Sequence, residues 1–122
     1  MAGVGSVSHV TTHVLDAACG RPAVGVAVEL LSTDGSYIAS GVTDDDGRIG
    51  DLGPDLLESG SYRLVFDTGS YFASSVTETF YPRVTIDFTV TPGVEAPGPK
   101  TAAHLHVPLL LSPFAYSTYR GS

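Results

Sequence analysis

The feature that most constrains this chain is an alternation of apolar and polar residues with a period of two. It runs through residues 26–30, 62–67 and 84–90, the last of which reads VTIDFTV. Successive side chains of an extended chain point to opposite faces of a sheet, so each segment predicts a strand with one face in a core. Helical patterning is scarce, and the best candidate is a short stretch at residues 69–75.

Turn-forming residues separate the expected strands. Residues 33–35 (TDG) predict a hairpin turn, and residues 44–47 (DDDG) and 58–60 (ESG) predict two further loops. The prolines and glycines of residues 91–101 predict a loop between two strands. Many short strands with regular turns predict an all-β, antiparallel sandwich of about seven or eight strands. The length fits one domain over residues 1–122, and we expect its first seven residues to be flexible.

Charge and composition exclude several classes of partner. The net charge of −7 argues against binding nucleic acid or an anionic membrane surface, because both attract basic faces. No apolar run approaches the ~20 residues that a membrane-spanning helix needs. The single cysteine, Cys19, excludes an intrachain disulfide, and the N-terminus lacks a secretory signal. These features favour a cytoplasmic protein, in which an anionic ligand must meet a local positive side chain.

Two histidines share one face of the predicted strand at residues 104–111. Alternation places four apolar residues on the core face, namely Leu105, Val107, Leu109 and Leu111. It places four mixed residues on the other face, namely His104, His106, Pro108 and Leu110. A mixed outer face predicts contact with another subunit, and two solvent-facing histidines are the alternative. The strand alone leaves both interpretations open.

Two more candidate residues lie earlier in the chain. His13 occupies a strand at residues 10–16, on the face opposite Val14, where a structural histidine is the simpler interpretation. His9 precedes that strand, and we expect it to be frayed. Arg48 lies at a loop–strand junction, where functional residues are common, although an ion pair with a neighbouring aspartate is the local alternative. The aromatic pattern of residues 112–122 predicts a C-terminal strand docked in the sheet.

Four motifs in order carry a family resemblance. They are residues 12–16 (THVLD), 46–48 (DGR), 106–113 (HVPLLLSP) and 119–122 (YRGS), the last at the chain end. In this combination the chain resembles the transthyretin-related 5-hydroxyisourate hydrolases, over essentially its whole length after about residue 7. The hormone-binding transthyretins share the fold of that family but lack its histidines and its terminal tetrapeptide.

The resemblance implies a fold, a reaction and a set of site residues. The fold is a transthyretin-like sandwich of two four-stranded, mainly antiparallel sheets with one short helix, assembled as a homotetramer (a dimer of dimers) with active sites between dimers. The reaction is hydrolysis of 5-hydroxyisourate to 2-oxo-4-hydroxy-4-carboxy-5-ureidoimidazoline in urate catabolism, without a cofactor. The family's catalytic residues fall on His13, Arg48 and His106. Its substrate-binding tetrapeptide falls on Tyr119, Arg120, Gly121 and Ser122.

The chemistry of those residue types suits the reaction. Histidine is a base near neutral pH and can activate water, and a guanidinium can hold the oxygen on which negative charge develops. Tyr119 can stack on a flat heterocycle. The sequence leaves open which histidine takes the proton and whether His104 assists.

Three other interpretations of these residues compete with a metal-free hydrolase. His104, His106 and His13 could bind zinc as three ligands, although the resemblance requires no metal. A calcium loop at residues 44–47 fails, because Val42 and Gly53 stand where acidic ligands are needed. A non-catalytic, ligand-carrying or adhesive sandwich is compatible with the fold alone.

Overall fold

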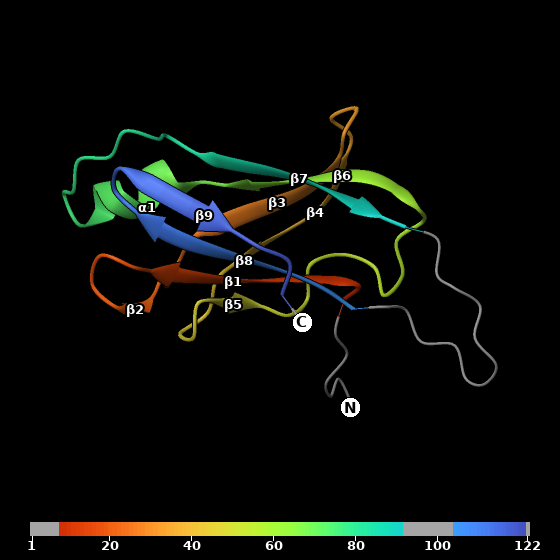
Figure 1. Cartoon of the computed structure of the whole chain (residues 1–122), viewed down its shortest axis with the longest axis horizontal. Coiled ribbons are helices and arrows are strands. Elements are labelled where there is room, and N and C mark those ends of the chain that lie inside the picture. The colour runs from red at the N-terminus through yellow and green to blue at the C-terminus, as the bar shows by residue number, and fades with distance from the viewer. Residues whose placement is uncertain (1–7, 92–103, 122) are drawn as a thin grey trace.

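The computed structural model describes residues 8–91 and 104–121 (Figure 1). These residues form two stacked sheets and one short helix, which confirms the predicted all-β sandwich. The expected flexible start (residues 1–7), most of the proline-rich loop and Ser122 lie outside the described residues. The strands and the helix are β1 (Val10–Asp16), β2 (Arg21–Pro22), β3 (Ala27–Ser32), β4 (Tyr37–Val42), β5 (Arg48–Ile49), β6 (Gly60–Phe66), α1 (Thr68–Ser74), β7 (Val84–Val90), β8 (Leu105–Ser112) and β9 (Ala115–Thr118).

The two sheets differ in composition. One has the order β4-β3-β6-β7 and is antiparallel throughout, as predicted. The other has the order β2-β1-β8-β9, with β5 also paired to β1, so it holds five segments instead of the expected four. The difference arises because the two-residue strands β2 and β5 pair with successive parts of β1, at Leu15–Asp16 and at Thr12–His13. Only the pairing of β1 with β8 is parallel among the described strands.

The buried faces of the strands form one hydrophobic core. The alternation predicted for residues 26–30 is observed, since Val26, Val28 and Leu30 are buried while Ala27 and Glu29 are exposed. The core-facing residues of β8 are buried beside them in the same cluster, Leu109 at 0% and Leu111 at 2% exposure. Burying an aliphatic side chain of this size stabilises a fold by about 1.5–3 kcal/mol. The core therefore fixes which face of each strand is left for function.

The predicted turns and helix are also confirmed. The hairpin between β3 and β4 turns at Gly35, whose φ of 93° lies in a region that L side chains rarely adopt. Helix α1 begins after Asp67, whose side chain accepts a hydrogen bond from the N–H of Ser70 and so caps the helix. No helix in residues 8–91 and 104–121 has the length and apolar character to cross a membrane.

One expectation about a single residue is wrong, and one residue on the outer face is more buried than its neighbours. His9 is not frayed: it is 6% exposed, and its Nδ1 accepts a hydrogen bond from the N–H of Leu57 at 2.8 Å. The loop before β6 therefore holds the residue that precedes β1, and no local sequence pattern indicates this contact. Pro108 lies on the predicted outer face, since it is in register with His13, and it is buried there. It lies in a central strand, with His13 of β1 in register and β9 on its other side.

Candidate active site

Strand register gathers the predicted histidines and the arginine on one face of the β1–β8 sheet. His13 of β1 lies opposite Arg48 of β5, Thr11 of β1 lies opposite His106 of β8, and Gly121 forms an isolated bridge with His106. Side chains of residues directly opposite each other in a sheet point to the same face. We call this the histidine face, and its residues are Thr11, His13, Arg48, His104, His106 and Gly121.

The side chains of the histidine face surround a small pocket. The ring centroids of His13 and His106 are 6.4 Å apart, with the ring planes at 36°. Beside them lies a pocket of about 280 Å³, which is lined by Thr11, Thr12, Arg48, Ile49, Gly50, His104 and His106. This volume is close to the lower end of the range for small-molecule sites, roughly 300 Å³. A molecule in this pocket can therefore touch the side chains of Arg48, His104 and His106, and the ring of His13 lies beside that of His106.

The loop before β5 holds Arg48 in place. The carboxylate of Asp44 accepts hydrogen bonds from the N–H groups of Arg48 and Asp46, both at 2.9 Å. These bonds, with that from Arg48 first, hold the pKa of the Asp44 carboxyl below its usual value. Gly47 lets the loop approach β1, because a Cβ there would lie 2.4 Å from the carbonyl oxygen of Val14. These contacts hold the main chain at Arg48 in a fixed position beside β1.

In the described part of the chain, the guanidinium of Arg48 forms no ion pair with the neighbouring aspartates. Within residues 8–91 and 104–121 the only ion pair joins Arg63 to Asp87, on the other sheet. Asp44, the nearest candidate partner, contacts the main-chain N–H of Arg48 instead. The positive charge of Arg48 is therefore available to a ligand.

A main-chain contact sets the tautomer of His13. Its Nε2 lies 2.9 Å from the carbonyl oxygen of Asp46. A carbonyl oxygen can only accept, so Nε2 must carry a hydrogen and donate it. In the neutral ring the lone pair is consequently on Nδ1. His13 is thereby tied to the same loop that carries Arg48.

His106 is half-buried and held by a side chain. Its Nδ1 lies 2.8 Å from Oγ1 of Thr11, and Nε2 has no hydrogen-bond partner in the described part of the chain. Burial lowers the pKa of His106 below its ordinary value, and the nearby positive charges of Arg48, His104 and His13, in that order, lower it further. The ring is therefore neutral at neutral pH, with Nε2 accessible.

Thr11 is a member of this site that the sequence reasoning missed. It is 6% exposed, and its Oγ1 also lies 2.7 Å from Nε2 of His104. A signal was present, because Thr11 stands two residues before His13 and therefore on the same face of the strand. Alternation along β1 therefore predicts that the side chains of Thr11 and His13 lie on the same face.

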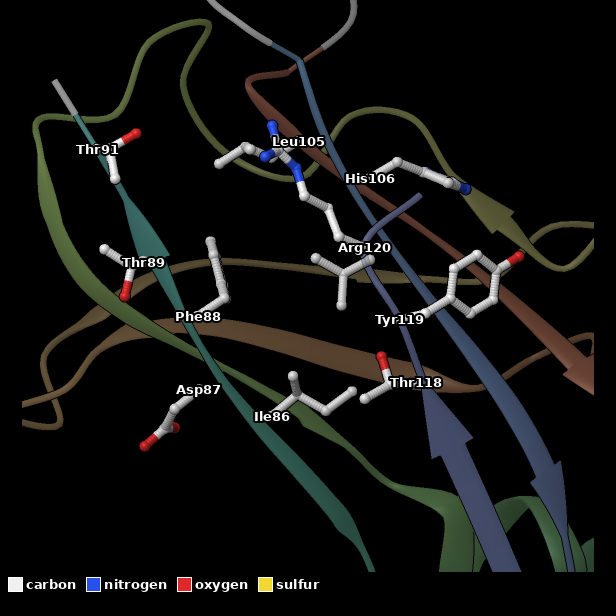
Figure 2. Close-up of a pocket in the computed structure, with 11 residues that line it drawn as sticks. Ile86, Asp87, Phe88, Thr89, Thr91, Leu105, His106, Thr118, Tyr119 and Arg120 are labelled. Atoms are coloured by element: carbon white, nitrogen blue, oxygen red, sulfur yellow. The ribbon is translucent and has the colours of Figure 1, made fainter. Parts of the chain in front are cut away.

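The C-terminal residues alternate between two faces of the sheet. Figure 2 shows the ring of Tyr119 extending to the same side as that of His106, whereas the side chain of Arg120 extends toward Leu105. Arg120 lines a second pocket, of about 330 Å³, beside β7. Gly121 lies against His106 and donates its N–H to the His106 carbonyl at 2.8 Å. Ser122 lies outside the described residues.

The three imidazoles do not surround a common point. His13 directs Nε2 to a carbonyl oxygen, while His104 and His106 share the hydroxyl of Thr11. Over residues 8–91 and 104–121, no three side chains of the metal-ligating types form a group that could hold an ion. The arrangement instead offers two imidazoles and one guanidinium to an organic ligand.

Known proteins that are similar to the chain belong to one family and share its fold. The family model described as "HIUase/Transthyretin family" matches residues 10–121. The chain is 42% identical over 116 residues to 5-hydroxyisourate hydrolase of Salmonella typhimurium (92% of this chain, 79% of that protein). It is 41% identical over 121 residues to the Mus musculus enzyme of that name (94% of this chain, 96% of that protein).

Solved structures are similar over nearly the whole fold. The 5-hydroxyisourate hydrolase of Klebsiella pneumoniae superposes with a TM-score of 0.80 at 37% identity, covering 93% of this chain and 98% of that one. Transthyretin of Sparus aurata superposes with a TM-score of 0.77 at 32% identity, covering 92% and 95%. The fold is common to both proteins, so the fold alone does not distinguish between their functions.

Proposed function

The chain belongs to the HIUase/Transthyretin family, and we propose that within it this protein is a 5-hydroxyisourate hydrolase of urate degradation. The observation that carries the proposal is the histidine face, where two imidazoles and an unpaired guanidinium meet beside one pocket. Ring opening by water needs a base near neutral pH and a positive group for the developing charge. The product is 2-oxo-4-hydroxy-4-carboxy-5-ureidoimidazoline.

In this mechanism His106 is the base. Its neutral Nε2 takes a proton from water as the water oxygen attacks the ring carbonyl. Arg48 holds the carbonyl oxygen while it carries negative charge, because a planar guanidinium can donate two parallel hydrogen bonds. The C–N bond of the ring then breaks, and the leaving nitrogen takes a proton from His106. His13, with its lone pair on Nδ1, orients the water or the substrate.

The terminal tetrapeptide completes the binding site. Tyr119 is 58% exposed beside His106 and can stack on the flat substrate. Gly121 supports the imidazole directly. The side chain of Arg120 extends toward Leu105 and lines the pocket beside β7, which Tyr119 and His106 also line. Ser122 follows directly and is the fourth residue of the proposed binding segment.

We further propose that the protein is a homotetramer in which a second copy covers the histidine face. Leu110 is only half-buried there, and Phe114, in the turn before β9, remains 62% exposed. Apolar surface of this kind marks an interface. Sedimentation should give a species of four times 12.7 kDa. A stable monomer at micromolar concentration would contradict the tetramer.

Decay of freshly prepared 5-hydroxyisourate tests the enzymatic proposal. The ultraviolet signal of the substrate should decay many times faster with the protein than without it, and a strong chelator should leave the rate unchanged. Loss of the acceleration with chelator would indicate a metal-dependent reaction. No acceleration by the wild-type protein would refute the hydrolase and favour a non-catalytic, ligand-binding sandwich.

A further inference from the structure

One hydroxyl joins two imidazoles on the histidine face. Oγ1 of Thr11 lies 2.7 Å from Nε2 of His104 and 2.8 Å from Nδ1 of His106. A hydroxyl has a single proton, so it can donate to one of these nitrogens only while it accepts from the other. The protonation of the two rings is therefore coupled through Thr11.

The direction of this coupling decides whether His106 can act as a base. When Thr11 donates to His104, its oxygen accepts the Nδ1–H of His106, and Nε2 of His106 keeps its lone pair. When Thr11 donates to His106 instead, Nδ1 holds the lone pair, and Nε2 carries the hydrogen. Only the first direction presents a basic nitrogen to the pocket, since Nδ1 faces Thr11.

The state of His104 selects the direction. His104 is exposed, so its Nδ1 can keep a hydrogen bonded to water while Nε2 accepts from Thr11. If His104 gains a proton, Nε2 becomes a donor and the hydroxyl must turn toward His106. The charged and titratable groups beside His106 are His104 itself, His13 of β1, Arg48 of β5 and Tyr119 of the terminal segment. Of these, His104 alone shares a hydrogen-bond partner with Nδ1 of His106.

We propose that Thr11 and His104 are positioning residues, which keep the hydrogen of neutral His106 on Nδ1 and so leave Nε2 as the base. The inference rests on the proposed hydrolase function and assigns two residues to it beyond His13, Arg48 and His106. Thr11 is buried in β1 and fixed by its register opposite His106, so the hydroxyl is held where the coupling needs it.

Two variants of Thr11 separate the hydroxyl from the shape of the side chain. Thr11→Val keeps the branched shape and removes the hydroxyl, whereas Thr11→Ser keeps the hydroxyl. We expect Thr11→Val to lower kcat about 10- to 100-fold with KM changed less than about twofold, since a positioned base contributes about 10²–10⁴ in rate. Thr11→Ser should restore kcat to within about threefold of wild type. Thr11→Val with wild-type kcat would overturn the inference.

A matched pair of variants at the exposed His104 tests the other end of the hydrogen-bond chain through Thr11. In His104→Gln an amide oxygen accepts the hydrogen bond from Thr11 but cannot gain a proton. We therefore expect kcat to stay near the wild-type value and to fall less than the wild-type kcat on the acid side of the pH profile. His104→Phe offers no acceptor, so kcat should fall as in Thr11→Val. Equal kcat and equal pH profiles in the two variants would overturn the inference, even if Thr11→Val fails to fold.

The tautomer itself can be read without any substrate. Long-range ¹H–¹⁵N spectra of the histidine rings should place the hydrogen of neutral His106 on Nδ1 in the wild-type protein and move it to Nε2 in Thr11→Val. Finding it on Nε2 in the wild type would refute the positioning role. A wild-type protein that shows the Nδ1 tautomer but does not hydrolyse 5-hydroxyisourate would refute the proposed function and, with it, the catalytic purpose of the arrangement.

Discussion

Gly121 packs so closely against His106 that one added carbon tests the geometry of the site. A Cβ at position 121 would lie 2.7 Å from Cδ2 of His106 and 3.2 Å from its Cβ and Cγ. Carbon atoms prefer separations of about 3.5–4.0 Å, so the closest contact must open by about 1 Å. Either the ring of His106 rotates or the terminal segment moves away. A displacement of about 1 Å at a reacting group can cost about 10²-fold in rate.

We therefore expect Gly121→Ala to lower kcat about 10- to 100-fold while melting hardly changes. Gly121 lies beyond the last strand and outside the core cluster, so the fold does not depend on it. The assay is the ultraviolet decay of 5-hydroxyisourate, with thermal melting measured in parallel. Ser61→Ala, at an exposed position on the opposite sheet, is the control and should change neither. Near wild-type turnover in Gly121→Ala would refute the argument that this contact sets the position of His106.

Four further predictions follow from the same geometry. Arg48→Lys should fold normally and lose most activity, because lysine keeps the charge but not the planar fork; normal turnover would make Arg48 a mere surface charge. His13→Ala and His106→Ala should each cost nearly as much rate as the double variant, and losses that add in free energy would mean that the rings act separately. Burial lowers the pKa of His106 from its ordinary value of 6.5, so a rate that needs the neutral ring should hold through neutral pH and fall only as the pH drops through this lowered pKa. A pH profile that rises toward acid would contradict this base. Gly47→Ala should lower the free energy of unfolding by at least about 1–3 kcal/mol in denaturant titration, because φ is +76° and the Cβ would meet the Val14 carbonyl; an unchanged midpoint would show that the loop shifts freely.

Local alternation predicted the faces of the strands well, because it depends only on whether one side of an extended segment meets a core. The burial of Leu109 and Leu111 and the half-exposure of His106 are examples. The same rule, extended to Thr11, would have placed that hydroxyl beside His13. Its contact with His104 and His106 could not follow, because alternation does not say which strands are neighbours.

The features that local patterns did not show arise mainly from contacts between distant segments. His9 was expected to fray because it precedes a strand, yet a loop some 48 residues later holds its ring. Pro108 lies on the face that alternation predicts, but alternation does not show that it is buried in a central strand. The side chains of Tyr119 and Arg120 extend to opposite sides of the sheet, because they continue the alternation of β9. The family motif treats the four terminal residues together and does not show this difference. The resemblance supplied the grouping of His13, Arg48 and His106 that local patterns lacked.

The parallel pairing of β1 with β8 has a consequence for how activity emerges during folding. Thr11 and His106 are 95 residues apart, so closing the chain between them costs more entropy than closing any hairpin in the molecule. Pairings of such long range form slowly, because the entropy of closing the loop is lost before the contacts stabilise the chain. A chain that has completed its hairpins but not this pairing contains most of its secondary structure and no active site. Recovery of turnover after dilution from denaturant therefore reports the closure of the whole sheet, not the appearance of β-structure.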